Sequence, residues 1–222
     1  MKKYLSEPRF TTYLNACGGD DAQATELYLR TMKLSGAALE AIHTCEIVLR
    51  NSIDAELRVW NKTKTGDPEW TMRPAPLLRG ILDLGETLPK ATAAAKQALG
   101  KRREPTHDDI VSQFSLGTWK FLLPTQRHQG KQMLWDECLQ GAFPLRFEVP
   151  PSAILESVNI VNELRNRVAH FEPIFALDLR GKRHSIRKVL NVINRDMRKW
   201  HDSHERFLAE IDRFYADWPK FR

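Results

Sequence analysis

Apolar side chains recur three and four positions apart through the first third of the chain. Beyond Ser35 they form one continuous series: Ala38, Leu39, Ile42, Cys45, Val48, Leu49, Ile53 and Leu57. Such spacing marks one face of an α-helix, because successive helical residues are about 100° apart. It predicts a long helix from residue 35 that ends at the polar segment 60–68. An earlier helix is predicted over residues 22–30, capped by Asp20 or Asp21.

The same helical spacing continues toward the C-terminus. Further helices are predicted over residues 76–84, 89–99, from 106 onward, 115–124, 152–171 and from about 185 to 215. No segment alternates apolar and polar residues as a half-buried strand does. The pattern therefore predicts an all-α fold. No repeat, low-complexity tract or Ser/Gly linker divides it, so we expect a single domain over residues 1–222.

Composition places the chain among ordinary globular proteins, with 42% hydrophobic and 28% charged residues in a length of 222. No run of eighteen apolar residues is present, and the segment Met1 to Pro8 lacks the apolar core of a signal peptide. We therefore expect a cytoplasmic protein that does not enter a membrane. Cys17, Cys45 and Cys138 have no paired spacing, which favours buried thiols over a disulfide or a zinc site. We expect neither a metal nor another cofactor.

The net charge of +6 suits a polyanionic partner, although a mild positive excess also occurs in proteins that bind no nucleic acid. Two basic clusters stand out, at residues 101–103 and 180–188. We expect the first to lie in a solvated loop. The second follows closely behind the segment described next, so we expect it to bind RNA phosphates through Lys182, Arg183, Arg187 and Lys188.

One short segment, Leu164 to Pro173, gathers the side chains that an enzyme needs around a phosphodiester. It places Arg165, Asn166 and His170 within six residues at the end of a predicted helix. At about 100° per residue, Asn166 and His170 lie one turn apart, and Arg165 lies about 140° from His170. The alternative is that these side chains only cap helix carbonyls and interact favourably with the helix dipole.

A fixed cation, an amide and a titratable imidazole together support RNA cleavage without a metal. In this chemistry a 2′-hydroxyl attacks the adjacent phosphate, His170 transfers protons and Arg165 stabilises the charge of the transition state. One helix supplies only half of such a site. Two copies packed about a dyad would bring two arginines and two histidines into one groove, so the pattern favours a homodimer.

The spacing Arg165-Asn166-x3-His170 resembles the Arg-x4-6-His signature of HEPN ribonuclease domains. Its surroundings look like the Abi-like, or abortive-infection, branch of that superfamily. Further landmarks of this branch follow in the family's order along the chain. They are residues 5–14, similar to its N-terminus, residues 46–51, similar to its first long helix, and SLGTW at residues 115–119, similar to its Ser-Phe-Gly-x-Trp segment with Leu116 where Phe is usual.

The resemblance implies an all-helical, HEPN-like bundle with additional helices that forms a homodimer. It also implies a metal-independent endoribonuclease that acts as a toxin in toxin–antitoxin or antiviral abortive-infection systems. Arg165 and His170 would be catalytic, and Asn166 would support them. Arg50 and Asn51 either lie near the site and contact RNA or have a structural role.

Two other interpretations stay open at this point. The same surface could belong to an RNA-binding regulatory protein that holds a small RNA with little or no catalysis. His201 and His204, followed by Glu205, have a spacing that metal ligands use on a helix. Without a further convergent ligand, that spacing favours a solvated helix face.

Overall fold

Every regular element that the structure describes is helical. The computed structural model describes residues 5–84, 86–125 and 127–222. Its α-helices are α2 (Glu7–Ala16), α3 (Asp21–Thr65), α4 (Pro76–Asp83), α5 (Thr87–Leu99), α6 (His107–Ser112), α7 (Leu116–Leu122), α8 (Gln129–Glu137), α9 (Pro151–Ala169), α10 (Leu179–Ile193), α11 (Arg195–His204) and α12 (Phe207–Asp217). Short 3-10 helices are η1 (Leu139–Ala142), η2 (Arg146–Glu148) and η3 (Pro219–Phe221). The predicted all-α fold is confirmed.

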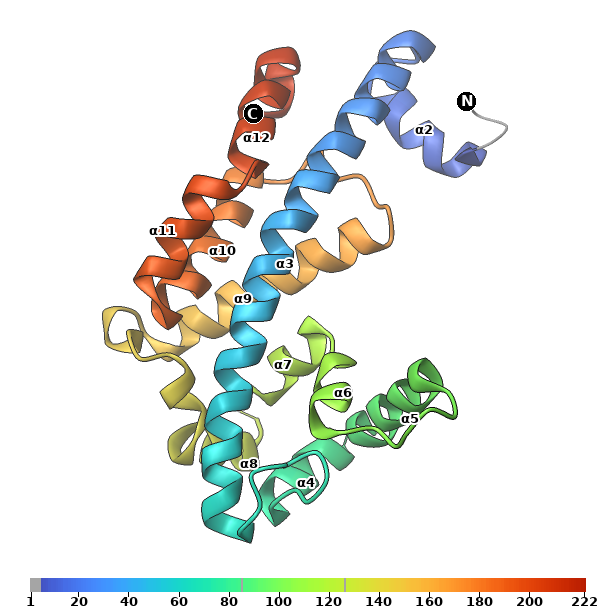
Figure 1. The fold of residues 1–222 in the computed structure, drawn as a ribbon. Helices are drawn as coiled ribbons and strands as arrows, with labels where there is room; N and C mark the ends of the chain where they lie inside the picture. The colour runs from blue at the N-terminus through green and yellow to red at the C-terminus, as the bar shows by residue number, and fades with distance from the viewer. Residues whose placement is uncertain (1–4, 85, 126) are drawn as a thin grey trace.

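The 45-residue helix α3 is the axis of the molecule (Figure 1). The Asp20 carboxylate caps its start by accepting hydrogen bonds from the N–H groups of Ala22 (2.8 Å) and Gln23 (2.9 Å). Gly66 ends it in the left-handed conformation, at φ 82°. At about 1.5 Å per residue, α3 is about 67 Å long and can support separate groups of helices along its length.

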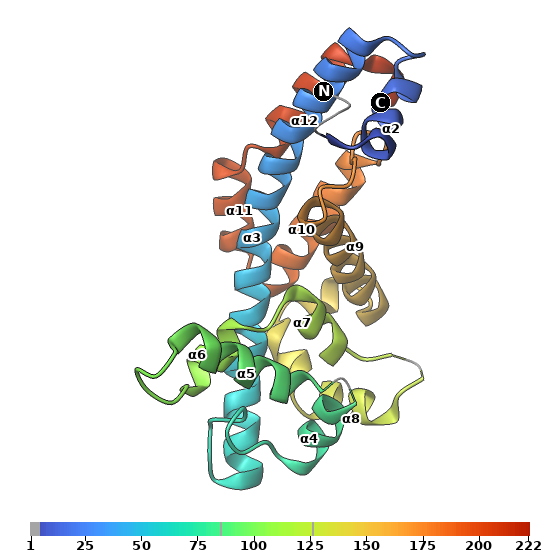
Figure 2. The ribbon, with the colours of Figure 1, turned by 90° about the vertical axis from the view of Figure 1, so that its right-hand side faces the viewer.

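Three groups of helices follow one another along α3. Both ribbon views place α2 and α12 beside its N-terminal part, α9, α10 and α11 beside its middle, and α4 to α8 around its C-terminal end (Figures 1 and 2). α9 packs against α10, α3 and α7. The C-terminal end of α9 therefore lies on the side of the molecule where α2 meets the N-terminal part of α3.

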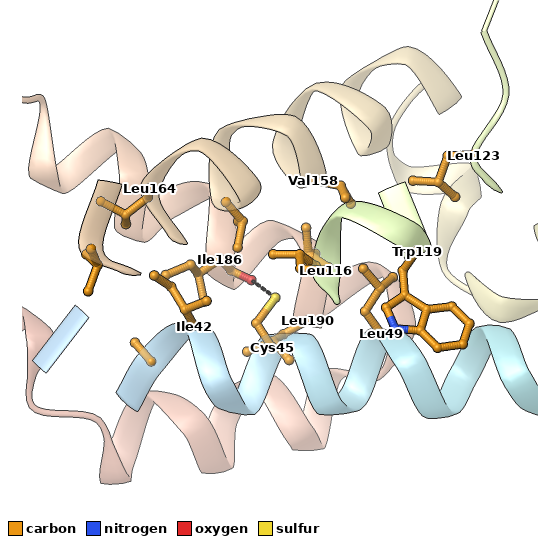
Figure 3. Close-up of a cluster of buried hydrophobic side chains, with 14 of the residues drawn as sticks. Ile42, Cys45, Leu49, Leu116, Trp119, Leu123, Val158, Leu164, Ile186 and Leu190 are labelled. Carbon is orange, nitrogen blue, oxygen red and sulfur yellow. Dashed lines mark hydrogen bonds between the residues drawn. The ribbon is translucent and has the colours of Figure 1, made fainter. Parts of the chain in front are cut away.

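The core beneath α9 joins four helices. Figure 3 shows Ile42, Cys45 and Leu49 of α3 facing Leu164 and Val158 of α9, with Ile186 and Leu190 of α10 and Leu116 and Trp119 of α7 completing the cluster. These side chains are almost completely buried. Such burial stabilises each large apolar side chain by about 1.5–3 kcal/mol, which fixes α9 in position on α3.

The helix α3 is longer than the helices predicted in its place. The two predicted helices, 22–30 and 35–57, are one continuous helix that reaches Thr65. Ser35 and Gly36 do not interrupt it, because neither residue removes the backbone donor that a proline would. The predicted polar break at 60–68 starts too early, since Trp60 and its neighbours still belong to α3.

The predicted final helix over residues 185–215 is wrong in its continuity, because the structure has three helices there. Asn194 ends α10 with extended backbone (φ −160°, ψ 120°). Its side chain then accepts hydrogen bonds from the N–H groups of Asp196 (2.8 Å) and Met197 (3.0 Å), which starts α11. The apolar spacing hides this break because α10 and α12 both bury a face against α3.

Cys17, Cys45 and Cys138 are free and buried, as predicted. Burial raises the pKa of the Cys45 and Cys138 thiols to about 12, so neither is a thiolate at neutral pH. None of the helices in the described residues is long and apolar enough to cross a membrane.

Candidate active site

The segment that carries the arginine, asparagine and histidine forms the C-terminal end of α9. Pro151 occupies the first turn, where its missing N–H is not needed. Ile154, Val158 and Val161 bury one face of the helix in the core. The predicted helix over residues 152–171 is thus present, and it ends two residues earlier than expected.

A Schellman motif ends α9, with an unusual residue at its turning point. The Phe171 N–H donates to the Val168 carbonyl at 3.1 Å, and the Glu172 N–H donates to the Arg167 carbonyl at 2.8 Å. Phe171 has φ 55°, in the left-handed region where glycine is usual. His170 is the last residue before this reversal and caps the helix at φ −90° and ψ 8°.

Arg165, Asn166 and His170 lie together at this helix end with unengaged side chains. Arg165 is half-buried, whereas Asn166 and His170 are exposed. The backbone links two of them, since the His170 N–H donates to the Asn166 carbonyl oxygen at 2.9 Å. Within the described part of the chain, none of the three side chains makes a hydrogen bond or an ion pair. All three are therefore available to a ligand.

Both Arg50 and Asn51 belong to α3, where Arg50 is half-buried and Asn51 is exposed. The Arg50 Nε donates to Asn51 Oδ1 at 3.2 Å, so the two side chains contact each other. No hydrogen bond or ion pair joins either of them to α9 among residues 5–84, 86–125 and 127–222. Arg50 is eleven residues beyond Leu39, which places it on about the same side of α3 and about 16 Å further along.

Most of the basic side chains on α10 form ion pairs with carboxylates of the same protein. The ion pairs join Arg183 to Glu205 (2.6 Å), Arg187 to Asp202 (2.7 Å), Lys182 to Glu163 (3.6 Å) and Arg180 to Asp212 (2.5 Å). Of the four RNA contacts predicted within this cluster, only Lys188 makes no such pair in the described residues. The cluster therefore offers less free charge than its sequence indicates. The other basic cluster, 101–103, lies in the exposed loop between α5 and α6, as predicted.

Asp202 is the centre of this ion-pair network. Burial opposes its charge, but the hydrogen bonds from Arg187 and the nearby guanidinium groups of Arg198 and Arg183 outweigh that cost and hold the pKa of Asp202 below its usual range. The network joins α10 to α11. Its arginines have a structural task that competes with RNA binding.

His201 and His204 do not form the solvated face that their spacing favours. His201 is buried, and neither ring nitrogen has a hydrogen-bond partner of ordinary geometry in the described part of the chain. His204 is exposed and stacks on Trp200, with ring centroids 4.6 Å apart. Glu205 is bound to Arg183. The described residues contain no group of three or more His, Cys, Asp or Glu side chains that could hold a metal ion.

A buried polar cluster on the C-terminal half of α3 and its neighbours consists of Thr71, His107 and Asp54. The Thr71 N–H donates to His107 Nδ1 at 3.4 Å, so the ring proton lies on Nε2, which is 3.0 Å from Asp54 Oδ1. The Thr71 hydroxyl is 2.9 Å from the same Nδ1. Hydroxyl, imidazole and carboxylate also follow this order in hydrolytic triads. Here Thr71 and His107 are buried and the Trp70 indole donates to the same carboxylate at 2.8 Å, so we assign the cluster a structural role.

A groove of about 390 Å³ lies directly beside the end of α9. Its walls come from three segments: Tyr13 of α2, Tyr28, Met32 and Leu39 of α3, and Phe171 behind α9. Sequence reasoning missed this groove, because its residues are far apart in the chain. The local signal that could have indicated it is an aromatic residue directly after His170.

Comparisons with models of protein families, with curated proteins and with solved structures found no match to this chain.

Proposed function

We propose that this protein is a metal-independent endoribonuclease of the HEPN type that acts as a homodimer. The observation that carries this proposal is the free state of Arg165, Asn166 and His170 at one end of α9, within the residues that the structure describes. The neighbouring arginines on α10 are paired with carboxylates, as is Arg167 with Glu172 at 3.8 Å. The resemblance to Abi-like proteins adds support for a toxin role in abortive infection.

The reaction needs only groups that this helix end and the RNA supply. The ribose 2′-oxygen forms a bond to phosphorus, and the bond from phosphorus to the 5′-oxygen breaks. The imidazole of His170 accepts the 2′-hydroxyl proton and then, as imidazolium, donates a proton to the leaving 5′-oxygen. Arg165 stabilises the negative charge of the transition state. The products are a 2′,3′-cyclic phosphate and a 5′-hydroxyl, and DNA resists cleavage because it lacks the 2′-hydroxyl.

The angle between the two main side chains supports a dimer. Along α9, Arg165 and His170 diverge by about 140°, so one helix does not aim both at one phosphate. A second α9 packed about a dyad would place the arginine of one copy opposite the histidine of the other. Each of the two sites then has one arginine and one histidine, and His170 acts in its site first as base and then as acid.

The primary test measures cleavage of total RNA in the presence of EDTA. We expect wild-type protein to cleave, and His170→Ala and Arg165→Ala each to lower the rate at least about 100-fold. Arg79→Ala serves as the matched control, since Arg79 is exposed and lies on α4, beside the C-terminal end of α3 (Figure 1). Cleavage that requires a divalent metal, or that survives both substitutions, would contradict the mechanism.

A mixing experiment tests the dimer. If the arginine and histidine act across the dyad, a 1:1 mixture of Arg165→Ala and His170→Ala recovers roughly one quarter of the wild-type activity through its heterodimers. If both residues act within one copy, the mixture stays inactive. Sedimentation velocity measures the oligomeric state in parallel. RNA binding without cleavage by any preparation would instead support the regulatory RNA-binding protein.

A further inference from the structure

The groove beside His170 has no part in the proton transfers described above. It is about 390 Å³, within the range of pockets that hold small organic groups. The end of α9 supplies one wall, with Val168, Phe171 and Glu172, and α2 and α3 supply the others. Phe171 directly follows His170, which does not itself line the groove, so a group in the groove lies one residue along the chain from the proposed catalytic imidazole.

Phe171 is held in an unfavourable position. Its side chain is 74% exposed, and its backbone φ of 55° is one that residues other than glycine rarely adopt. Glycine would end α9 without this strain. The helix end therefore keeps an exposed aromatic ring in the groove at a cost to stability, a pattern that is found at ligand-binding positions.

The remaining walls combine aromatic rings with polar groups. Tyr13 and Tyr28 form an edge-to-face pair with centroids 5.3 Å apart. Burial, with a smaller contribution from Tyr28, raises the pKa of Tyr13 to about 12, so its hydroxyl stays protonated. Arg9 forms no ion pair with a carboxylate of the described chain. Glu172 is exposed, and its contact with Arg167 is long, at 3.8 Å.

We propose that this groove binds one base of the RNA next to the scissile phosphate. Phe171 stacks on the base, the Glu172 carboxylate accepts a hydrogen bond from an exocyclic amino group, and Arg9 contacts the backbone phosphate. Adenine, cytosine and guanine carry such an amino group and uracil does not, so the groove selects against uracil. This inference rests on the proposed ribonuclease function, because it names the part of the RNA that the site holds.

Charge and chemistry favour a base over an apolar segment of a second copy. The groove has a free cation, Arg9, and a carboxylate, Glu172, at its walls, together with the hydroxyl-bearing residues Tyr28 and Ser35. The centre of a protein–protein interface is depleted in charged residues. A nucleotide matches this set, because it presents an aromatic face, hydrogen-bonding edges and an anionic phosphate.

The test uses wild-type protein and short single-stranded oligonucleotides with 2′-O-methyl ribose, which cannot be cleaved. Fluorescence anisotropy measures the binding of adenine, cytosine and uracil pentamers. We expect Phe171→Ala to weaken binding of the adenine pentamer about tenfold and Phe171→Trp to preserve it. Phe147→Ala is the matched control, since Phe147 is 84% exposed and lies in η2, outside the groove. Glu172→Gln should reduce the preference for adenine over uracil.

The outcomes separate this inference from the proposed function. If Phe171→Ala binds and cleaves like wild type while cleavage still needs His170, the base groove is refuted and the ribonuclease stands. If binding depends on Phe171 but no RNA is cleaved, the groove stands and the ribonuclease fails. Wild-type protein that binds no pentamer refutes the groove. Sedimentation that shows Phe171→Ala breaking a dimer assigns the groove to a second copy and also overturns the proposal.

Discussion

Asp54 is the point at which a single substitution should do most damage to the C-terminal half of α3. Its carboxylate accepts hydrogen bonds from the Trp70 indole (2.8 Å), from His107 Nε2 (3.0 Å) and from Arg58 Nε (2.8 Å). Trp70 and His107 are almost completely buried, so water cannot replace the lost acceptor. The perturbation is Asp54→Ala.

The size of the effect follows from the three donors. Each buried donor left without a partner costs about 1–3 kcal/mol. Arg58 is partly exposed and keeps a second ion pair with Asp108, so its loss adds no more than about 1 kcal/mol. We therefore expect Asp54→Ala to lower the free energy of unfolding by about 4 kcal/mol at pH 7.

Urea unfolding followed by tryptophan fluorescence measures this value, since Trp70 reports directly on the site. Asp136→Ala is the control, because Asp136 is exposed and its carboxylate accepts a hydrogen bond from the Gln132 side chain, and it should change stability by less than about 0.5 kcal/mol. A loss below about 1 kcal/mol for Asp54→Ala would show that the cluster is not a structural anchor.

The same carboxylate makes the stability of the protein depend on pH. Burial opposes its charge, but the hydrogen bonds from His107, Arg58 and Trp70 outweigh that cost, and the pKa of Asp54 lies below its usual range. A carboxylate with a lowered folded-state pKa stabilises the protein above the unfolded pKa of about 3.9. That contribution is lost as the pH falls through the folded-state pKa. Asp54→Asn should flatten the acid limb of the stability profile.

Three further outcomes follow from two buried groups and one half-buried carboxylate. Burial lowers the pKa of His201, so stability is greatest above about pH 6.5 and falls as the pH drops below that value. Urea unfolding at pH 5 and pH 7 should show this loss for wild type and not for His201→Leu. Burial raises the pKa of Cys45 to about 12, so a thiol-specific reagent should label it only after unfolding. Asp202→Asn weakens the pair with Arg187 and should lower stability by about 1–2 kcal/mol in thermal unfolding, whereas Asp196→Asn, an exposed carboxylate, should not.

Helix periodicity predicted the fold class because many of the helices bury an apolar face, and α2, α7, α9, α10 and α12 pack against α3. It failed where polar side chains set the boundaries. Asn194 divides the predicted C-terminal helix by capping α11, and nothing in the apolar spacing marks that change. The helices α2 and α8 were not predicted, since α2 and α8 each bury only a few side chains.

The candidate site was also predicted only in part, because helix spacing shows which residues are neighbours within one helix but not which residues meet between helices. Arg165, Asn166 and His170 are close in sequence, so their shared position at the end of α9 follows from one helix. Ion pairs are different, because their acceptors come from other helices. Nothing local in residues 180–188 indicates that Asp202 and Glu205 neutralise Arg187 and Arg183. Long-range pairing of this kind requires the tertiary structure.

The distribution of free charge decides how RNA binding should respond to salt. Each phosphate neutralised on a single strand contributes about −0.7 to the slope of log K against log salt. If Arg9 and Arg165, which have no carboxylate partner in the described chain, are the contacting cations, the slope is about −1.4. If Lys182, Arg183 and their neighbours on α10 also bind phosphate, six cations give a slope of about −4. The ion pairs of α10 favour the shallow value, so pentamer binding measured from 50 to 200 mM salt should weaken by less than about tenfold. A steep slope would show that the α10 pairs open on RNA and that this surface, rather than the end of α9, supplies most of the binding energy.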